Sequence, residues 1–327
     1  MFSYRSLLKQ ALTIAWKQKY LWVFGLFASL VASSGSWEYK ILTENLNQSM
    51  AGGSYYKLSG FLSVGEFIKN FFISFKNIFN YDLVTILNAI TLLLIALIIM
   101  VVFVWLAIVC QAALVSGIKK LSNNKKKNSL LSLRLELAES NKHFWPVLGL
   151  NFLTKVLISV AFFIIGLPLL FILIKDSTTA AIIYTLLFII FFPVATGLAL
   201  MLKYAIAYNV LEKTSFVKSI KKAWQLFMKN WLVSLEMAII LFLISLLFSG
   251  LIMLFLFLSM APLLILGLMF KAIWLVVFVM MIAIIVIVLT GSLLTTFQIA
   301  AWTSLFLRLK DKGVAAKLER LFGGQKK

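Results

Sequence analysis

Histidine and cysteine are almost absent from this chain, whose 327 residues include one of each, His143 and Cys110. A metal centre built from His and Cys side chains therefore lacks its ligands, and a single cysteine cannot close a disulfide within the chain. We expect His143, beside Phe144 and Trp145, to face lipid headgroups, and Cys110 to serve as a small apolar helix residue. No metal and no cofactor is expected.

Acidic residues are scarce too, with 11 Asp and Glu against 31 Lys and Arg. Glu236 is the one carboxylate that falls inside an apolar segment. An isolated carboxylate does not make the pair that general acid–base catalysis uses, and the chain has no glycine-rich phosphate loop. We therefore expect no catalytic residues and no enzyme activity.

Apolar residues, in contrast, make up 62% of the chain, and its mean hydropathy is +1.03. Too few charged side chains remain to cover that much apolar surface, so lipid must solvate it. Spanning segments of about 20 residues form helices, because lipid offers the backbone no hydrogen-bond partners. We predict an all-α polytopic membrane bundle, one integral membrane domain over 1–327. Its six transmembrane helices correspond to six apolar runs: Tyr20–Ser36, Leu83–Ile118, Val156–Ile174, Ala180–Leu202, Met237–Met260 and Ala272–Leu307.

The first run is short, and Ala32–Ser34 resembles the cleavage site of a signal peptide. Small residues recur along one face of the run, which suits close packing between helices in a membrane. They are Gly25, Ala28, Ala32 and Ser36. We expect a retained first span, with cleavage as the alternative.

Two other runs, Leu83–Ile118 and Ala272–Leu307, are longer than a bilayer requires. They are expected to tilt, to extend beyond the bilayer, or to break at Gly117 and Gly291. Pro262 is expected to mark the turn between the last two runs.

The basic residues are unevenly distributed. If the N-terminus is cytoplasmic and six spans follow, most of them lie on the cytoplasmic side, including a basic tail at 308–327. This bias predicts cytoplasmic termini in a prokaryotic inner membrane, and it explains the net charge of +20 without nucleic acid. It also predicts attraction to anionic lipids of the inner leaflet.

Aromatic–basic segments precede three pairs of apolar runs, at Leu8–Trp22, Leu130–Trp145 and Phe216–Trp231. We expect amphipathic helices lying in the membrane interface. The interfacial side chains are Trp16, Trp22, Trp145, Trp224, Trp231, Lys221, Lys222 and Lys229.

The far ends of the three pairs are also alike, since similar tetrapeptides precede each basic exit. They are Gln111-Ala-Ala-Leu, Lys203-Tyr-Ala-Ile and Gln298-Ile-Ala-Ala. Matching starts and ends predict three hairpin repeats, at about 5–121, 129–213 and 215–312, related by an axis along the membrane normal.

An outer loop at 37–82 carries a further helix signal. Ser63 and Glu66 have capping-box spacing, and an apolar stripe follows them. We expect an amphipathic helix on the outer leaflet. It either stabilises the start of the second span or serves as a lid or docking helix.

The segments Ile220-Lys-Lys-Ala-Trp-Gln-Leu-Phe-Met-Lys-Asn-Trp231 and Ala15-Trp-Lys-Gln-Lys-Tyr-Leu-Trp-Val-Phe-Gly-Leu-Phe27 carry a resemblance. The chain resembles a broad group of uncharacterised prokaryotic six-helix membrane proteins, similar to the membrane domain of glycerophosphodiester phosphodiesterases. The likeness spans nearly the whole chain, and its motifs are degenerate. It implies the six-helix architecture. The hydrolytic activity of those enzymes belongs to a separate domain that has no counterpart here.

Polar side chains near the ends of several runs form a candidate site around Glu236. A carboxylate in a membrane helix needs a partner or a cavity, and either Lys155 or Lys203 supplies an opposite charge. Asn151, Gln111 and Gln298 extend the site. The alternative is that the lysines reach to the interface and Glu236 makes one structural ion pair.

Three classes of function follow. The first is a non-enzymatic membrane protein that binds or organises lipids or membrane-protein partners, which we favour because polar groups gather at the span ends. The second is a transporter or permease component moving a small or lipid-like substrate. The third, a membrane-embedded lipid-modifying enzyme, lacks a catalytic cluster.

Overall fold

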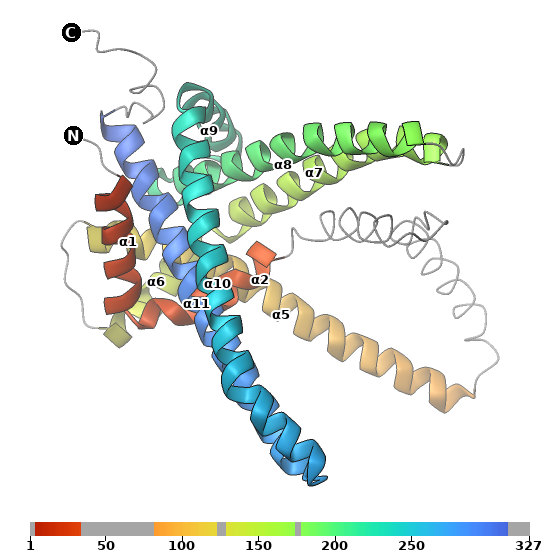
Figure 1. The fold of residues 1–327 in the computed structure, drawn as a ribbon. Coiled ribbons are helices and arrows are strands. Elements are labelled where there is room, and N and C mark those ends of the chain that lie inside the picture. The colour runs from red at the N-terminus through yellow and green to blue at the C-terminus, as the bar shows by residue number, and fades with distance from the viewer. Residues whose placement is uncertain (1–3, 34–81, 123–128, 174–177, 313–327) are drawn as a thin grey trace. The chain divides into compact units, whose positions relative to one another are not determined.

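The computed structural model describes residues 4–33, 82–122, 129–173 and 178–312 (Figure 1). These ranges are helical and contain no strand, which confirms the all-α prediction. The helices are α1 (Tyr4–Lys17), α2 (Tyr20–Ser33), α5 (Leu83–Ser122), α6 (Ser129–Asn141), α7 (Phe144–Leu173), α8 (Thr178–Glu212), α9 (Phe216–Lys229), α10 (Trp231–Met269) and α11 (Ile273–Lys312). Most of the predicted outer loop and the end of the basic tail lie outside the described residues.

Among the described residues, four stretches of helix are long and apolar enough to cross a membrane. They are Val84–Leu121, Pro193–Glu212, Trp231–Met269 and Ile273–Lys310. Arg134–Asn141 and Phe144–Val160, bent by 68° at their break, bring the number to five if they count as one span. Tyr20–Ser29 in α2 is apolar but shorter. The described residues therefore contain four or five candidate membrane-spanning helices, and six remains a prediction.

The chain divides into two compact units. The first consists of Met1–Leu30, Ala107–Asn151 and Ala199–Lys327, and the second of Val31–Leu106 and Phe152–Leu198. The second unit thus holds the N-terminal part of α5, most of α7 and the N-terminal part of α8. The remaining described helices belong to the first unit, which contains the features discussed below.

α10 and α11 form a hairpin in the first unit. Their turn lies at Phe270–Ala272, where the Ala272 amide donates to the Gly267 carbonyl over 2.8 Å. Lys271 adopts a left-handed backbone with φ of 51°. The prediction that Pro262 marks this turn is wrong, because Pro262 lies inside α10. Neighbouring helices and local adjustments can tolerate proline in a membrane helix.

The predicted breaks at Gly117 and Gly291 are also wrong, because α5 and α11 are each continuous over 40 residues. The part of α5 and of α11 that exceeds a bilayer span instead lies in a packed region of the first unit. Here we call this region the junction. It comprises α1, α2, α6, α9, the ends of α5, α8 and α11 from Ala107, Ala199 and Ser292 onward, and the first turns of α7 and α10.

The junction contains the buried core of the first unit. Its largest fully buried side chains include Leu7, Leu21, Phe24, Leu114, Ile118, Leu150, Tyr204, Met237, Leu305 and Phe306. The outer parts of α10 and α11 differ, since most of their large apolar side chains are exposed. In a membrane protein such a surface contacts lipid, so the specific packing of this hairpin is concentrated at the junction end.

Candidate functional site

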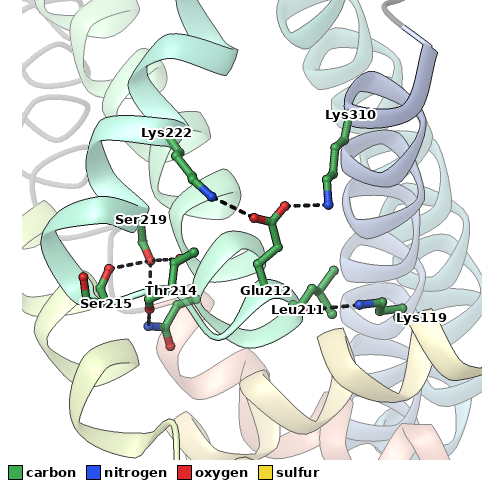
Figure 2. A network of polar contacts seen from close by, with 9 residues as sticks. Lys119, Leu211, Glu212, Thr214, Ser215, Ser219, Lys222 and Lys310 are labelled. Carbon is green, nitrogen blue, oxygen red and sulfur yellow. Dashed lines mark hydrogen bonds and ion pairs between the residues drawn. The ribbon is translucent and has the colours of Figure 1, made fainter.

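Glu212, the last residue of α8, lies at the centre of a polar network in the junction (Figure 2). Its carboxylate accepts from Lys222 Nζ of α9 over 3.0 Å and from Lys310 Nζ of α11 over 2.7 Å. The Glu212 side chain is 17% exposed. One half-buried carboxylate therefore joins three helices through two ion pairs.

The corner between α8 and α9 adds further hydrogen bonds to this network (Figure 2). Lys119 Nζ of α5 donates to the Leu211 carbonyl over 2.9 Å. Asn209 Nδ2 donates to the Thr214 carbonyl over 2.8 Å, and the hydroxyls of Thr214 and Ser219 are 2.6 Å apart. The end of α5 is thereby attached to the end of α8.

His143 contributes to the same corner and does not simply face outward. It is half-buried, and its Nδ1 lies 3.3 Å from Asn209 Oδ1. The link between α6 and α7 thus contacts α8. Trp145 agrees better with an interfacial position, because it is 76% exposed.

The last turns of α5, α8 and α11 each contact one of the helices α6, α9 and α1, which are predicted to lie in the membrane plane and are here called the in-plane helices. Lys120 of α5 pairs with Glu139 of α6 over 2.6 Å. Glu212 of α8 pairs with Lys222 of α9 as described above. Arg308 of α11 donates to Ser6 and Gln10 of α1, over 3.3 Å in both cases. The C-terminal ends of α5 and α8 thus contact the next helix along the chain, and the C-terminal end of α11 contacts α1.

A parallel set of contacts joins the same three ends to the helices that follow the in-plane ones. Asn151 of α7 donates to Gln111 Oε1 of α5 over 3.0 Å. The hydroxyls of Tyr204 of α8 and Ser234 of α10 are 2.7 Å apart. Thr296 Oγ1 of α11 donates to the Leu21 carbonyl of α2 over 3.3 Å. The ends of α5, α8 and α11 thus contact α7, α10 and α2, in the same order as they contact α6, α9 and α1.

Close backbone approach accompanies the contact between α2 and α11. Ser292 Oγ donates to the Trp22 carbonyl. A Cβ placed on Gly25 would lie 2.5 Å from the Ser292 carbonyl oxygen and 2.2 Å from Thr296 Oγ1. Only glycine fits there without displacement of the backbone. The predicted packing role of Gly25 and Ala28 is confirmed, since both are buried, whereas Ser36 lies outside the described residues.

The three predicted tetrapeptides occupy similar environments. Their alanines are buried in all three helix ends, at most 1% exposed. These alanines are Ala112 and Ala113 of α5, Ala205 of α8, and Ala300 and Ala301 of α11. Small side chains allow the helix ends to approach closely. Tyr204 and Tyr208 of α8 fill the remaining space against Phe306 of α11, with ring centroids 6.3 and 4.8 Å apart.

The predicted polar site around Glu236 is divided among separate contacts. Glu236 accepts from the Tyr4 hydroxyl of α1. Asn151 pairs with Gln111, and Gln298 Nε2 donates to Ser245 Oγ over 2.8 Å. These groups sit in the junction or beside it, and the Gln111–Asn151 and Gln298–Ser245 contacts are separate from each other.

The two candidate lysines are placed differently. Lys203 Nζ lies over the indole ring of Trp302, 4.6 Å from the centroid, which is a cation–π arrangement. Lys155 belongs to the second unit, so its pairing with Glu236 stays a prediction.

α9 has three distinct edges along its length. Ser219 and Ala223 form a buried edge, which Asn230 extends at the C-cap. Next around the helix is an apolar edge that is exposed, and beyond it a basic edge. The apolar edge consists of Val217, Trp224, Met228 and, at the start of α10, Trp231, between 51% and 71% exposed. The basic edge consists of Lys218, Lys221, Lys222 and Lys229.

α1 repeats this arrangement. Leu7, Ala11 and Ala15 are buried, and α1 lies alongside α11 (Figure 1). Leu12 and Trp16 are 53% and 62% exposed beside exposed basic residues. Trp16 packs edge-on against Trp22, with centroids 6.2 Å apart, and Trp22 Nε1 donates to the Ala15 carbonyl. α1 and α9 thus each have a fully buried alanine followed directly by an exposed tryptophan.

α6 departs from this pattern. Its buried positions include the polar residues Glu136 and Ser140, and Leu135 is half exposed. The Glu136 carboxylate lies against Gly117 of α5, where an added Cβ would be 2.9 Å from Oε2. The hydrogen bond from Lys120 lowers the pKa of the Glu139 carboxyl, although partial burial opposes the shift. In the part of α6 whose side chains are described, 134–141, the buried residues are therefore polar, and no apolar stripe is buried there.

Glu212 and Thr296 are junction residues that sequence reasoning missed. A signal for Glu212 exists in the predicted repeat, because it stands nine residues after Lys203, as Lys120 stands nine residues after Gln111. Both positions pair with the next in-plane helix, but with opposite charge. The charge reversal hides the equivalence in the sequence.

Groups of three or more His, Cys, Asp or Glu side chains able to hold a metal do not occur within the described ranges. Comparison with protein families, with curated proteins and with solved structures gives no match. The resemblance to the membrane domain of glycerophosphodiester phosphodiesterases therefore stays a prediction.

Proposed function

We propose that the protein is a non-enzymatic multi-pass membrane protein that binds or organises lipids or membrane-protein partners at the inner face of a prokaryotic cytoplasmic membrane. It consists of three hairpins, each preceded by an in-plane helix, with both termini cytoplasmic. The shared architecture of the prokaryotic six-helix group and of the glycerophosphodiester phosphodiesterase membrane domain is part of this proposal.

The order of contacts in the junction supports three equivalent hairpins. The end of one hairpin contacts the in-plane helix and the first long helix of the next, as in Lys120–Glu139 and Gln111–Asn151. The last hairpin contacts α1 and α2, as in Arg308–Gln10. A closed cycle of this kind is expected of three repeats around an axis along the membrane normal.

One observation carries the lipid-facing function: α1 and α9 each bury one edge in the junction and expose an apolar edge next to a basic one. Water does not stabilise an exposed row such as Val217, Trp224 and Met228, which are each more than half exposed. A bilayer surface solvates both edges, with tryptophan at headgroup level and lysine reaching the phosphates. The helices are thus held to the protein on one side and to the membrane surface on the other.

Transport receives less support. A transport site needs polar groups directed into one space, whereas Gln111, Asn151, Gln298 and Ser245 are paired in two separate contacts. The hydrogen bond from the Tyr4 hydroxyl to Glu236 connects α1 to α10. The polar groups of the junction thus mainly connect one helix to another.

Native mass spectrometry of the detergent-purified protein, with stepwise activation to remove co-isolated molecules, tests the proposal. Retained phospholipid or a stoichiometric membrane-protein partner is the expected result. A bare chain, or one that retains a polar small molecule and no lipid, would contradict it and favour transport. Cysteine labelling of the two termini in intact and lysed cells tests the orientation, and labelling of the termini before lysis would refute cytoplasmic ends.

A further inference from the structure

The four α9 lysines differ in how they are used within the protein. Lys222 is bound to Glu212 over 3.0 Å, next to the buried edge. Lys218, Lys221 and Lys229 are exposed and make no ion pair with any residue in the described part of the chain. α9 itself contains no acidic residue. Within the described residues, three positive charges on one helix therefore have no carboxylate partner.

The helical period defines where these charges lie around α9 relative to its apolar edge. Residues three or four apart share a helix face, so Lys221 stands beside Val217, Trp224 and Met228. Lys218 and Lys229 lie further round the helix, on the same side as Lys222, which is four residues from the first and seven from the second. When Trp224 and Trp231 sit among lipid headgroups, the three lysines are directed at the plane of the phosphates.

We propose that α9 is a docking surface for anionic phospholipid headgroups, with Lys218, Lys221 and Lys229 as its binding residues. This inference rests on the proposed function and names the lipid class that the in-plane helix selects. A water-soluble acidic partner would leave the exposed tryptophans and Met228 unsolvated, whereas a phospholipid satisfies both edges: acyl chains contact the apolar edge and the phosphate contacts the lysines. Charge complementarity selects an anionic headgroup over a zwitterionic one.

The test compares phosphatidylglycerol with phosphatidylcholine, each titrated onto the delipidated full chain and followed by native mass spectrometry. The wild type is expected to bind phosphatidylglycerol more tightly. Replacing all three unpaired lysines (Lys218→Gln, Lys221→Gln and Lys229→Gln) should lower that preference by about fivefold per lysine, on the order of a hundredfold if the effects add. The corresponding Lys→Arg triple variant should retain the preference, because the charge is unchanged.

Lys222→Gln is the matched control, since it removes one positive charge from the same helix but from a lysine already bound to Glu212. Its lipid preference should stay near that of the wild type. Equal losses in Lys222→Gln and in a single Lys221→Gln variant would overturn the assignment, as would a preference that survives the triple substitution. All three lysines are exposed, so the triple variant should fold, and an unchanged melting temperature would verify this.

Two failures are distinguishable. A wild-type chain that retains neither lipid nor partner contradicts the proposed function. A chain that retains lipid, but whose preference for phosphatidylglycerol is insensitive to the three lysines, contradicts this inference alone. Loss of a co-purifying acidic protein in the triple variant, with lipid preference intact, would identify the surface as a protein interface and would also overturn the inference.

Discussion

Gly25 offers a sharp test of whether α2 is a fixed part of the bundle. In Gly25→Ala the added methyl group would lie 2.5 Å from the backbone carbonyl oxygen of Ser292 and 2.2 Å from Thr296 Oγ1. The threonine hydroxyl can rotate away, but the carbonyl belongs to the backbone of α11 and cannot. α2 and α11 must therefore separate by about an ångström, the difference between 2.5 Å and an ordinary contact of about 3.4 Å.

The cost of this separation has two parts. Overpacking a well-packed site by one methyl group destabilises a protein by about 1–3 kcal/mol. The separation also lengthens the hydrogen bonds from Ser292 and Thr296 to α2, each worth about 1 kcal/mol. Against this, alanine favours a helix over glycine by about 1 kcal/mol. The expected net loss is about 2–4 kcal/mol.

Gly291 is the matched control because it lies next to Ser292 on α11, and a Cβ added there meets nothing within 4 Å. Gly291→Ala should be neutral or stabilising by up to about 1 kcal/mol. Thermal unfolding in detergent micelles, followed through tryptophan fluorescence, measures both variants. At about 2–4 °C per kcal/mol for a large domain, Gly25→Ala should melt several degrees below the wild type. Equal melting temperatures for the two variants would refute the packing of α2 on α11.

Glu212→Gln, which breaks two ion pairs, should destabilise the purified protein by about 1–3 kcal/mol. Glu139→Gln, which breaks one exposed pair, should cost less than about 1 kcal/mol. Similar melting temperatures for the two variants would contradict the central role of Glu212. Lys271→Gly should stabilise the hairpin by about 1 kcal/mol, since φ is 51° there, and Lys271→Ala should give no such gain in a chemical-denaturation experiment. In a cysteine-free background, a spin label at Met228 should be more accessible to oxygen than to a water-soluble nickel reagent, and a label at Gln225 should show the reverse. Identical accessibilities at the two positions would rule out an in-plane α9.

The sequence predicts the helices and the tight positions of the junction well, for identifiable reasons. An all-apolar run longer than a bilayer can only be helical. The alanines of the repeated tetrapeptides are buried because small residues mark close helix contacts, as at Ala113 and Ala300. The Ala–Trp pairs of α1 and α9 follow from the helical period, which places neighbouring residues on different edges.

The polar contacts could not be predicted in the same way. Glu212 is bonded to Lys310, a residue from a different hairpin, and a salt bridge of this kind depends on how helices pack rather than on local spacing. Lys203 was a candidate partner of Glu236, yet it lies over Trp302, because an indole face is a suitable partner for an ammonium group. The packing of α6 was harder still to predict, because its leucines recur every second residue and so define no single apolar face.

The position of the polar contacts has a physical explanation. Lipid gives apolar helices no hydrophobic reason to prefer one another to acyl chains, so membrane helices associate through close packing and hydrogen bonds. The exposed outer parts of α10 and α11 are rich in large apolar side chains. The junction instead holds Gly25, Ser234, Thr296 and the buried alanines, where backbones approach and hydroxyls find partners. One end of the hairpin therefore determines which helices meet, and the other supplies the surface that keeps it in the membrane.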